Sequence, residues 1–102
     1  MHLIQLFLPL RDDTGQRFGR ANFDRVREEL TEQFGGVTAF VRSPAAGAWE
    51  DDDGDVQRDE MILIEVMVET LDRGWWQSYR EEVRERFRQD ELLVRATAVQ
   101  VL

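Results

Sequence analysis

Two segments that share one pattern constrain the fold of this chain more than any other feature of its sequence. FDRVREELTEQF at 23–34 and WQSYREEVRERF at 76–87 align without a gap. In each segment, large apolar side chains recur every three or four residues, which is the spacing along one face of an amphipathic helix. The first set is Phe23, Val26, Leu30 and Phe34, and the second is Trp76, Tyr79, Val83 and Phe87. The match predicts two similar helices and favours a repeated structural unit.

Each predicted helix lies between two predicted strands. Leu3–Leu10 and Met61–Glu69 alternate as strands do, and their even-numbered residues are uniformly apolar, so this face should lie against the helices. The other two strands are predicted at Val37–Arg42, ended by Ser43-Pro44, and at Leu92–Leu102. The first helix is expected to begin with Asn22 as its N-cap and to stop at Gly35-Gly36, and the second to run from Asp72 to Gln89.

Strand-helix-strand twice over predicts one ferredoxin-like α+β domain covering residues 1–102. In this βαββαβ arrangement a four-stranded antiparallel sheet carries both helices on one face. Between the second and third strands, the sequence is rich in turn-forming and acidic residues. Asp53-Gly54, flanked by Trp49 and Val56, predicts the tip of a hairpin extension there.

Charge and residue types exclude several classes of function. The net charge is −8 at pH 7, so we expect the surface to repel nucleic acids and anionic membranes. There is no run of about 20 apolar residues and no signal-peptide pattern, so a cytoplasmic location is expected. The chain has no cysteine and no lysine, which excludes thiol nucleophiles, disulfides and Schiff bases. With His2 as the single histidine, no metal or cofactor is expected.

The predicted fold leaves one sheet face without helices, and its residues follow from strand parity. They are Leu3, Gln5, Phe7, Phe40, Arg42, Met61, Leu63, Glu65, Met67, Arg95, Thr97 and Val99. Such a face is more apolar than the surface of a monomer usually is. We therefore predict a homodimer in which the two sheets face one another.

Glu65, on a central strand of this face, is the candidate for chemistry. Together with Gln5, Phe7, Arg42 and Arg95 it is predicted to bind a small-molecule ligand. A carboxylate enclosed in a dimer cavity could act as a general base, with Arg42 or Arg95 stabilising an anionic intermediate. The alternative is a structural ion pair at the subunit interface.

Three other motifs have structural explanations. Asp51–Asp55 with Glu60 resembles a calcium loop, but Trp49 stands where the first ligand should be, so a solvated hairpin tip is favoured. Trp75 and Trp49 are each candidates for an interface or for covering a loop. Gly15 and Gly19 lack the spacing and the lysine of a phosphate-binding loop.

The segments FGGVTAF, GAWEDDDG and ERFRQDELLVRA carry a resemblance to small uncharacterised bacterial proteins with a G-x-W-x-[DE] hairpin, here Gly47–Asp51. At the level of the fold, the chain also resembles the dimeric α+β barrel superfamily. That resemblance implies ferredoxin-like domains paired through their sheets, in a group that includes cofactor-free monooxygenases, haem-degrading enzymes, lactone isomerases and proteins with no known reaction. Haem ligation by histidine has no counterpart here, because His2 stands alone.

Two main hypotheses of function remain open. The first is a homodimeric domain that binds a small molecule or a protein partner through the helix-free face. The second is a cofactor-independent enzyme, of monooxygenase or isomerase type, that uses Glu65 as general base on a small organic substrate. A third hypothesis is a regulatory subunit whose acidic hairpin meets a basic partner.

Overall fold

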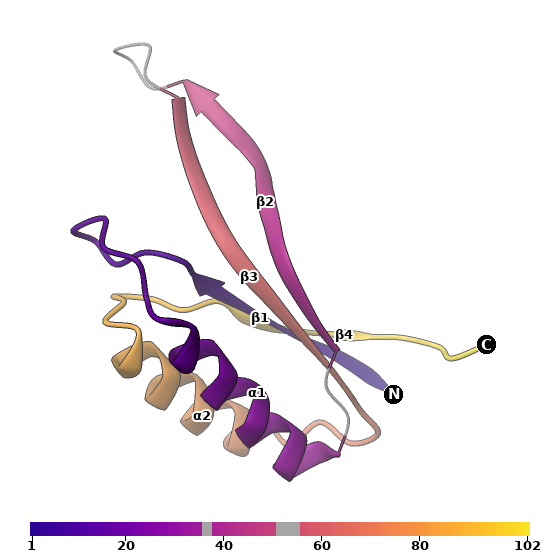
Figure 1. Ribbon diagram of the computed structural model, residues 1–102. Coiled ribbons are helices and arrows are strands. Elements are labelled where there is room, and N and C mark those ends of the chain that lie inside the picture. The colour runs from indigo at the N-terminus through magenta and orange to yellow at the C-terminus, as the bar shows by residue number, and fades with distance from the viewer. Residues whose placement is uncertain (36–37, 51–55) are drawn as a thin grey trace.

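The computed structural model describes residues 1–35, 38–50 and 56–102, with side chains described outside 38–60. Its elements are β1 (His2–Pro9), α1 (Arg20–Phe34), β2 (Thr38–Glu50), β3 (Val56–Val68), α2 (Arg73–Arg86) and β4 (Val94–Ala98). The two helices lie side by side on one face of an antiparallel sheet, and the hairpin of β2 and β3 extends beyond it (Figure 1). The predicted α+β class and the order of the elements are confirmed.

The strands pair in the order β2-β3-β1-β4. β1 is central: it pairs antiparallel with β3 from His2↔Val68 to Pro9↔Met61, and with β4 from His2↔Ala98 to Leu6↔Val94. β2 and β4 therefore form the two edges. This order brings the N-terminal strand between two strands that lie far along the chain.

The core lies between the helices and the sheet face that they cover. Alternate residues of β1 and β3 are buried there: Ile4, Leu6, Leu8, Ile64, Val66 and Val68. They pack with the buried face of each helix, formed by Phe23, Val26 and Leu30 on α1 and by Trp76, Tyr79 and Val83 on α2. The predicted parity of β1 and β3 and both helical stripes are thus confirmed, although Phe34 is only half-buried.

β2 differs most from the sequence prediction, because it continues through Ser43-Pro44 to Glu50 instead of ending there. Its pairing with β3 shifts register between Phe40 and Ser43 and again between Pro44 and Ala48. Proline cannot donate a backbone hydrogen bond, but an edge strand tolerates it, particularly at irregularities. The hairpin arms pair as far as Glu50↔Val56, while the predicted tip at 51–55 and its calcium-loop alternative lie outside the described residues.

The other element boundaries were predicted less accurately. β4 covers only Val94–Ala98, because beyond Ala98 its partner strand has reached the N-terminal residue; the Val99 N–H donates to the Met1 carbonyl. The predicted N-cap at Asn22 is wrong, since α1 begins after an extended Gly19 and the Asn22 N–H already donates to the Gly19 carbonyl. Gly35 does end α1 in the left-handed conformation, with φ of 83°.

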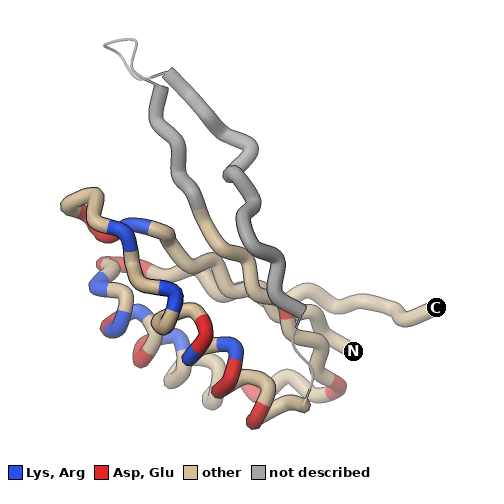
Figure 2. The backbone as a smooth tube through the Cα atoms, in the orientation of Figure 1, with Lys and Arg blue, Asp and Glu red and all other residues tan. Residues whose placement is uncertain are grey.

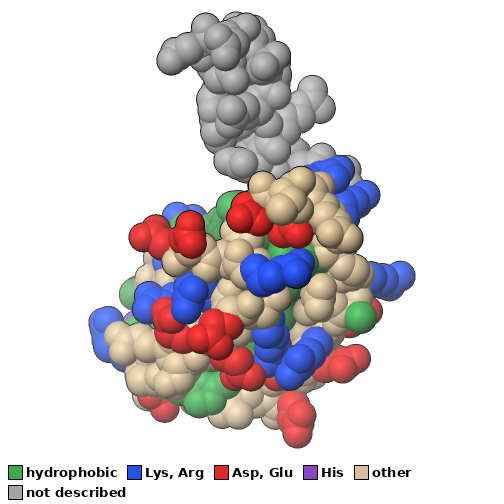
Figure 3. All heavy atoms as spheres, turned by 90° about the vertical axis from the view of Figure 1, so that its left-hand side faces the viewer, with side chains coloured by type: hydrophobic (Ala, Val, Ile, Leu, Met, Phe, Trp, Pro, Cys, Tyr) green, Lys and Arg blue, Asp and Glu red, His purple; other side chains and the backbone are tan. Residues whose placement is uncertain are grey.

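Charged residues are found mainly in the helices and loops of the described chain (Figure 2). On the face shown in Figure 3, arginines and carboxylates are interspersed, so that face has no broad area of one sign. No helix in the described part of the chain is long and apolar enough to cross a membrane.

Candidate functional site

Gln5 forms the centre of a polar row that crosses three strands on the helix-free sheet face. Strand register places Gln5 directly opposite Glu65 on β3 and opposite Arg95 on β4. The Gln5 amide donates from Nε2 to Oε2 of Glu65 at 2.8 Å, and Arg95 donates from Nε to Oε1 of Gln5 at 2.7 Å. An amide has both donor and acceptor groups, so Gln5 can link a carboxylate to a guanidinium. We call Glu65, Gln5 and Arg95 the polar row.

Apolar side chains border the polar row on its own face. The Arg95 guanidinium lies 5.0 Å from the centre of the Phe7 ring, a cation–π arrangement. Leu3, Phe7 and Leu63 are half-buried, whereas Met67 is 43% exposed. Strand register pairs Leu3 with Met67 and Phe7 with Leu63, so one apolar pair lies on each side of Gln5 and Glu65.

Leu93 also belongs to this surface, although the sequence did not assign it there. Its carbonyl accepts a hydrogen bond from the Phe7 N–H, and Leu93 is 54% exposed. With Phe7, Pro9 and Met61 it lines a surface cavity of about 310 Å³. The predicted strand Leu92–Leu102 already included Leu93, so the parity that assigned Arg95 to this face could have found it, although β4 itself begins at Val94.

Four of the five predicted ligand-binding residues thus lie together: Gln5, Phe7, Glu65 and Arg95. Arg42 is different, because it falls in the register shift of β2 between Phe40 and Ser43, and its side chain lies outside the described residues. The same holds for the side chains of Phe40 and Trp49. A one-residue shift exchanges the faces of a strand, so parity cannot assign Arg42 to either face.

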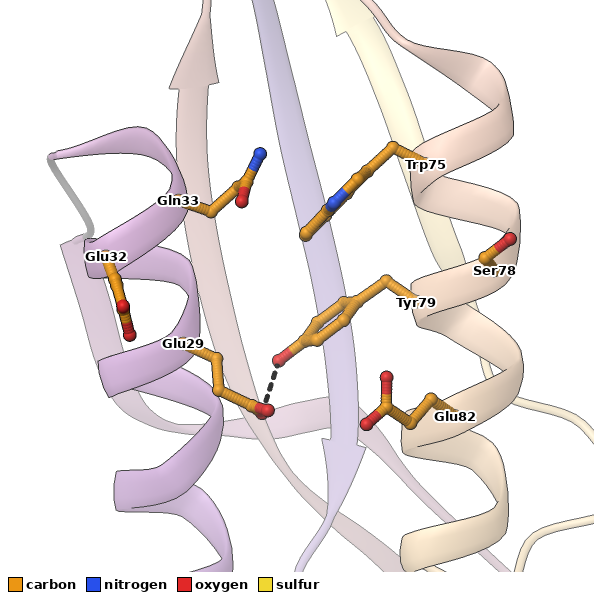
Figure 4. A pocket seen from close by; sticks show the side chains of 7 residues that line it. All are labelled: Glu29, Glu32, Gln33, Trp75, Ser78, Tyr79 and Glu82. Atoms are coloured by element: carbon orange, nitrogen blue, oxygen red, sulfur yellow. Dashed lines mark hydrogen bonds between the residues drawn. The ribbon is translucent and has the colours of Figure 1, made fainter.

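A second polar cluster joins the two helices on the opposite side of the sheet. Arg86 on α2 donates to both carboxylate oxygens of Glu29 on α1, with Nη2 2.7 Å from Oε2. Arg86 also donates to Glu82 at 2.7 Å, and the Tyr79 hydroxyl donates to Glu29 at 3.1 Å. The Tyr79–Glu29 bond is drawn in Figure 4, where the two side chains meet between the helices.

The electrostatics of this cluster indicate a structural role. The hydrogen bonds from Arg86 hold the pKa of Glu29 below its usual range, and the bond to Glu29 raises the pKa of the Arg86 guanidinium further. Burial, followed by the nearby Glu29 charge, raises the pKa of the Tyr79 phenol far above its usual value. At neutral pH, Glu29 and Arg86 are therefore charged and Tyr79 is neutral, so none of these three groups is set to exchange a proton.

Trp75 covers the seam between the helices beside this cluster. Its ring stacks on Tyr79, with centroids 4.9 Å apart, and meets Phe34 edge-on at 4.9 Å. Together with acidic side chains of both helices, Trp75 lines a shallow cavity of about 320 Å³ (Figure 4). The sequence reasoning missed the Glu29–Arg86 pair. The sequence does place a charged residue beside the apolar stripe of each predicted helix. The pattern of a single helix does not show which charged residue of the other helix it faces.

Metal-binding side chains do not gather in the part of the chain that the structure describes, which holds no group of three or more potential ligands. His2 is half-buried at the start of β1, opposite Val68 and Ala98.

Comparison with known proteins shows a likeness of fold. No family model matches the chain, and no curated protein matches it. A solved structure of a phage SAM lyase in complex with S-methyl-5'-thioadenosine superimposes with a TM-score of 0.59 at 18% identity, covering 94% of this chain and 79% of that one. The same type of enzyme in its apo state superimposes with a TM-score of 0.53 at 16% identity, covering 94% and 78%. The chain therefore shares its fold with phage SAM lyase.

Proposed function

We propose that this chain is a ferredoxin-like domain of the dimeric α+β barrel type, and that its helix-free face binds a small molecule at the polar row. The observation that carries the proposal is the pair of hydrogen bonds that unite Glu65, Gln5 and Arg95 in the middle of an apolar surface. Ligand sites combine apolar walls with a few oriented polar groups, and this row supplies a carboxylate, an amide and a guanidinium.

The orientation of Arg95 supports ligand binding. Its Nε is used by Gln5, while no bond of its two terminal nitrogens is found within the described residues. These nitrogens can donate to an acceptor on a ligand, and Glu65 can accept from hydroxyl or amino groups. Phe7, Leu63 and Met67 offer apolar surface to a ring lying over the row.

The likeness to SAM lyase suggests which ligand to test first. The solved structure contains S-methyl-5'-thioadenosine, a nucleoside with hydroxyl donors, a flat base and an apolar thioether. The carboxylate of Glu65 suits the hydroxyl donors, the guanidinium of Arg95 suits the base, and the apolar surface suits the thioether. We therefore propose an adenine nucleoside bearing a sulfur substituent as the ligand class.

We further propose that two copies pair through this face. The apolar residues around the row, with Met67 and Leu93 strongly exposed, form a surface that a second copy would remove from water. A dimer would also enclose the polar row, which strengthens each hydrogen bond to a ligand by lowering the local dielectric constant.

Binding can be measured by isothermal titration calorimetry with S-methyl-5'-thioadenosine and S-adenosylmethionine. Glu65→Gln and Arg95→Gln should each weaken binding by about tenfold or more, because hydrogen bonds to charged groups contribute about 1.5–3 kcal/mol. Glu85→Gln and Arg25→Gln, which change exposed charges on the helices, are matched controls and should bind as the unchanged protein does. Equal binding by all four variants would contradict the proposal.

Dimerisation can be measured separately by analytical ultracentrifugation. Met67→Glu should yield a monomer, because it adds a charge in the middle of the proposed interface. Gln77→Glu adds the same charge at an exposed position of α2 and should leave the dimer intact. A monomer at all concentrations in the unchanged protein would refute the dimer, while the binding measurement would still stand on its own.

A second candidate function is catalysis, and the shared fold with a lyase favours it. Gln5 holds the Glu65 carboxylate in the row, so Glu65 can take a proton from a carbon of a bound substrate. The C–H electrons then form a C=C bond as the C–S bond breaks, the C–S electron pair leaves on the thioether sulfur, and Arg95 can pair with an anionic group of the substrate. Formation of S-methyl-5'-thioadenosine from S-adenosylmethionine, followed by chromatography, tests this function. Glu65→Gln should abolish turnover and Glu85→Gln should not. If the unchanged protein binds the ligand without turnover, catalysis is refuted and only the binding function remains.

A further inference from the structure

A second cavity lies on the helix-covered side of the sheet, away from the polar row. It has a volume of about 680 Å³, and its lining residues come from the end of β1, the loop that follows, the first turns of α1, and β3. Its interior is lined by Leu10, Phe18, Phe23, Ile62 and Ile64. This volume is within the range of small-molecule sites, and an apolar lining is typical of them.

Three exposed arginines also line this cavity. Arg17, Arg20 and Arg27 line it together with one carboxylate, Asp24. Asp24 lies 3.7 Å from Arg20 and 3.7 Å from Arg27, and all three side chains are substantially exposed, so these ion pairs are weak. Among the lining residues that the structure describes, one carboxylate stands against three guanidinium groups, which gives this part of the lining a positive charge in a chain whose net charge is −8.

The loop before α1 is held in place by its own hydrogen bonds. Asp12 accepts hydrogen bonds from the Thr14 and Gln16 N–H groups, each at 2.9 Å. The Phe18 N–H donates to the Leu10 carbonyl at 2.9 Å, and the Phe18 ring meets Phe87 edge-on at 4.9 Å. The cavity wall formed by Phe18 is therefore built before any ligand arrives.

We infer that this cavity binds a small organic anion, with an apolar alkyl or aryl body inside and a carboxylate or phosphate group at the arginines. The apolar lining would contact the body of the ligand, and the arginines would pair with its negative charge. Guanidinium groups bind carboxylates and phosphates with two parallel hydrogen bonds, which favours such head groups over neutral ones. The site is separate from the polar row, on the other side of the sheet.

The test compares three probes that share one chain: octanoate, octyltrimethylammonium and octanol, all below micelle-forming concentrations. Amide resonances in 15N-labelled protein report the site of binding. Octanoate should shift the Phe18, Gly19 and Ile62 amides and bind more tightly than the other two probes. Added salt should weaken the binding of octanoate and leave that of octanol unchanged.

Charge variants test the arginines directly. Arg17→Gln with Arg27→Gln should weaken octanoate binding about tenfold. Asp24→Asn should strengthen it, because it frees Arg20 and Arg27. Arg25→Gln on the same helix, outside the cavity lining, is the matched control and should bind unchanged.

Three results would overturn the inference. The first is equal affinity for the three probes in the unchanged protein, a measurement that needs no variant to fold. The second is octanoate binding that survives the double arginine substitution with native amide dispersion. The third is a set of shifts confined to Gln5, Glu65 and Arg95, which would place octanoate on the polar row instead.

Discussion

Arg86 on α2 donates to both carboxylate oxygens of Glu29 on α1, so that one side chain of each helix ties the two together. The pair is mostly shielded from water: the Arg86 side chain is 16% exposed and that of Glu29 33%. It lies on the far side of the sheet from the polar row. The helix layer therefore has its own polar connection, in addition to the apolar core beneath it.

Glu29→Gln should destabilise the protein at neutral pH by about 1–3 kcal/mol, since it removes a charged partner from a shielded arginine. The hydrogen bonds from Arg86 lower the folded-state pKa of Glu29, so the stabilisation is present above the unfolded value of about 4.3 and is lost as the pH falls through the folded value. Urea unfolding at pH 7 and pH 3 measures this: the difference between the two proteins should shrink at pH 3. Glu32→Gln is the matched control, and an equal loss there would contradict a specific pair.

Tyr79 is the single tyrosine of the chain, so its ionisation can be followed directly by ultraviolet absorbance. Burial and the Glu29 charge raise its pKa, so the folded protein should show no phenolate at pH 10, where a free tyrosine is half ionised. The stability that this contributes is present below about pH 10 and falls as the pH rises further, because the unfolded phenol ionises first. Glu29→Gln should lower the Tyr79 pKa. Half-ionisation near pH 10 in the folded chain would show that the phenol is open to water.

Leu6 and Leu3 lie on opposite faces of β1 and provide a matched comparison. Leu6 is fully buried against the helices, so Leu6→Ala should cost about 2–5 kcal/mol at any protein concentration. Leu3 lies on the helix-free face and is half-buried, so Leu3→Ala should cost about 1 kcal/mol in dilute protein. If the two sheets pair, the cost of Leu3→Ala rises with protein concentration, as thermal unfolding over a dilution series would show. A constant cost would count against the paired sheets.

Asp12 organises the loop between β1 and α1, where its carboxylate accepts hydrogen bonds from the Thr14 hydroxyl and from two backbone N–H groups. Asp12→Ala should accelerate amide hydrogen exchange at Thr14 and Gln16, because both donors lose their acceptor. The bonds, with that from the Thr14 side chain first, hold the pKa of Asp12 below its usual range. In the unchanged protein, the protection of both amides relative to the intrinsic exchange rate at each pH should therefore be lost only in acid. Asp13→Ala, at the exposed next position, is the control and should leave both amides protected.

The elements of the fold could be predicted because local periodicity determines them. Alternation in Leu3–Leu10 and Met61–Glu69 identified which face of each strand is buried, and the matched stripes of Phe23–Phe34 and Trp76–Phe87 identified the helices. Prediction failed at the edges of the sheet. β2 continues through Pro44 because its partner β3 extends beside it. β4 stops at Ala98 because Ala98 pairs with His2, the first residue of its partner β1.

The site was predicted in part for the same reason. Parity placed Gln5, Glu65 and Arg95 on one face, but only the register of β1 with both neighbours brings Gln5 between the other two. Arg42 shows the limit, because the register shift of β2 removes the parity on which its assignment rested.

The sequence by itself determined the class of fold, the buried faces and the absence of thiol and lysine chemistry. Those properties depend on residue types and on neighbours a few positions apart. Only the tertiary structure decided that Gln5 bridges residues 60 and 90 positions away, that Glu29 meets Arg86 and that arginines line a cavity together with apolar side chains. Such contacts depend on strand register and helix packing, which a linear pattern does not encode.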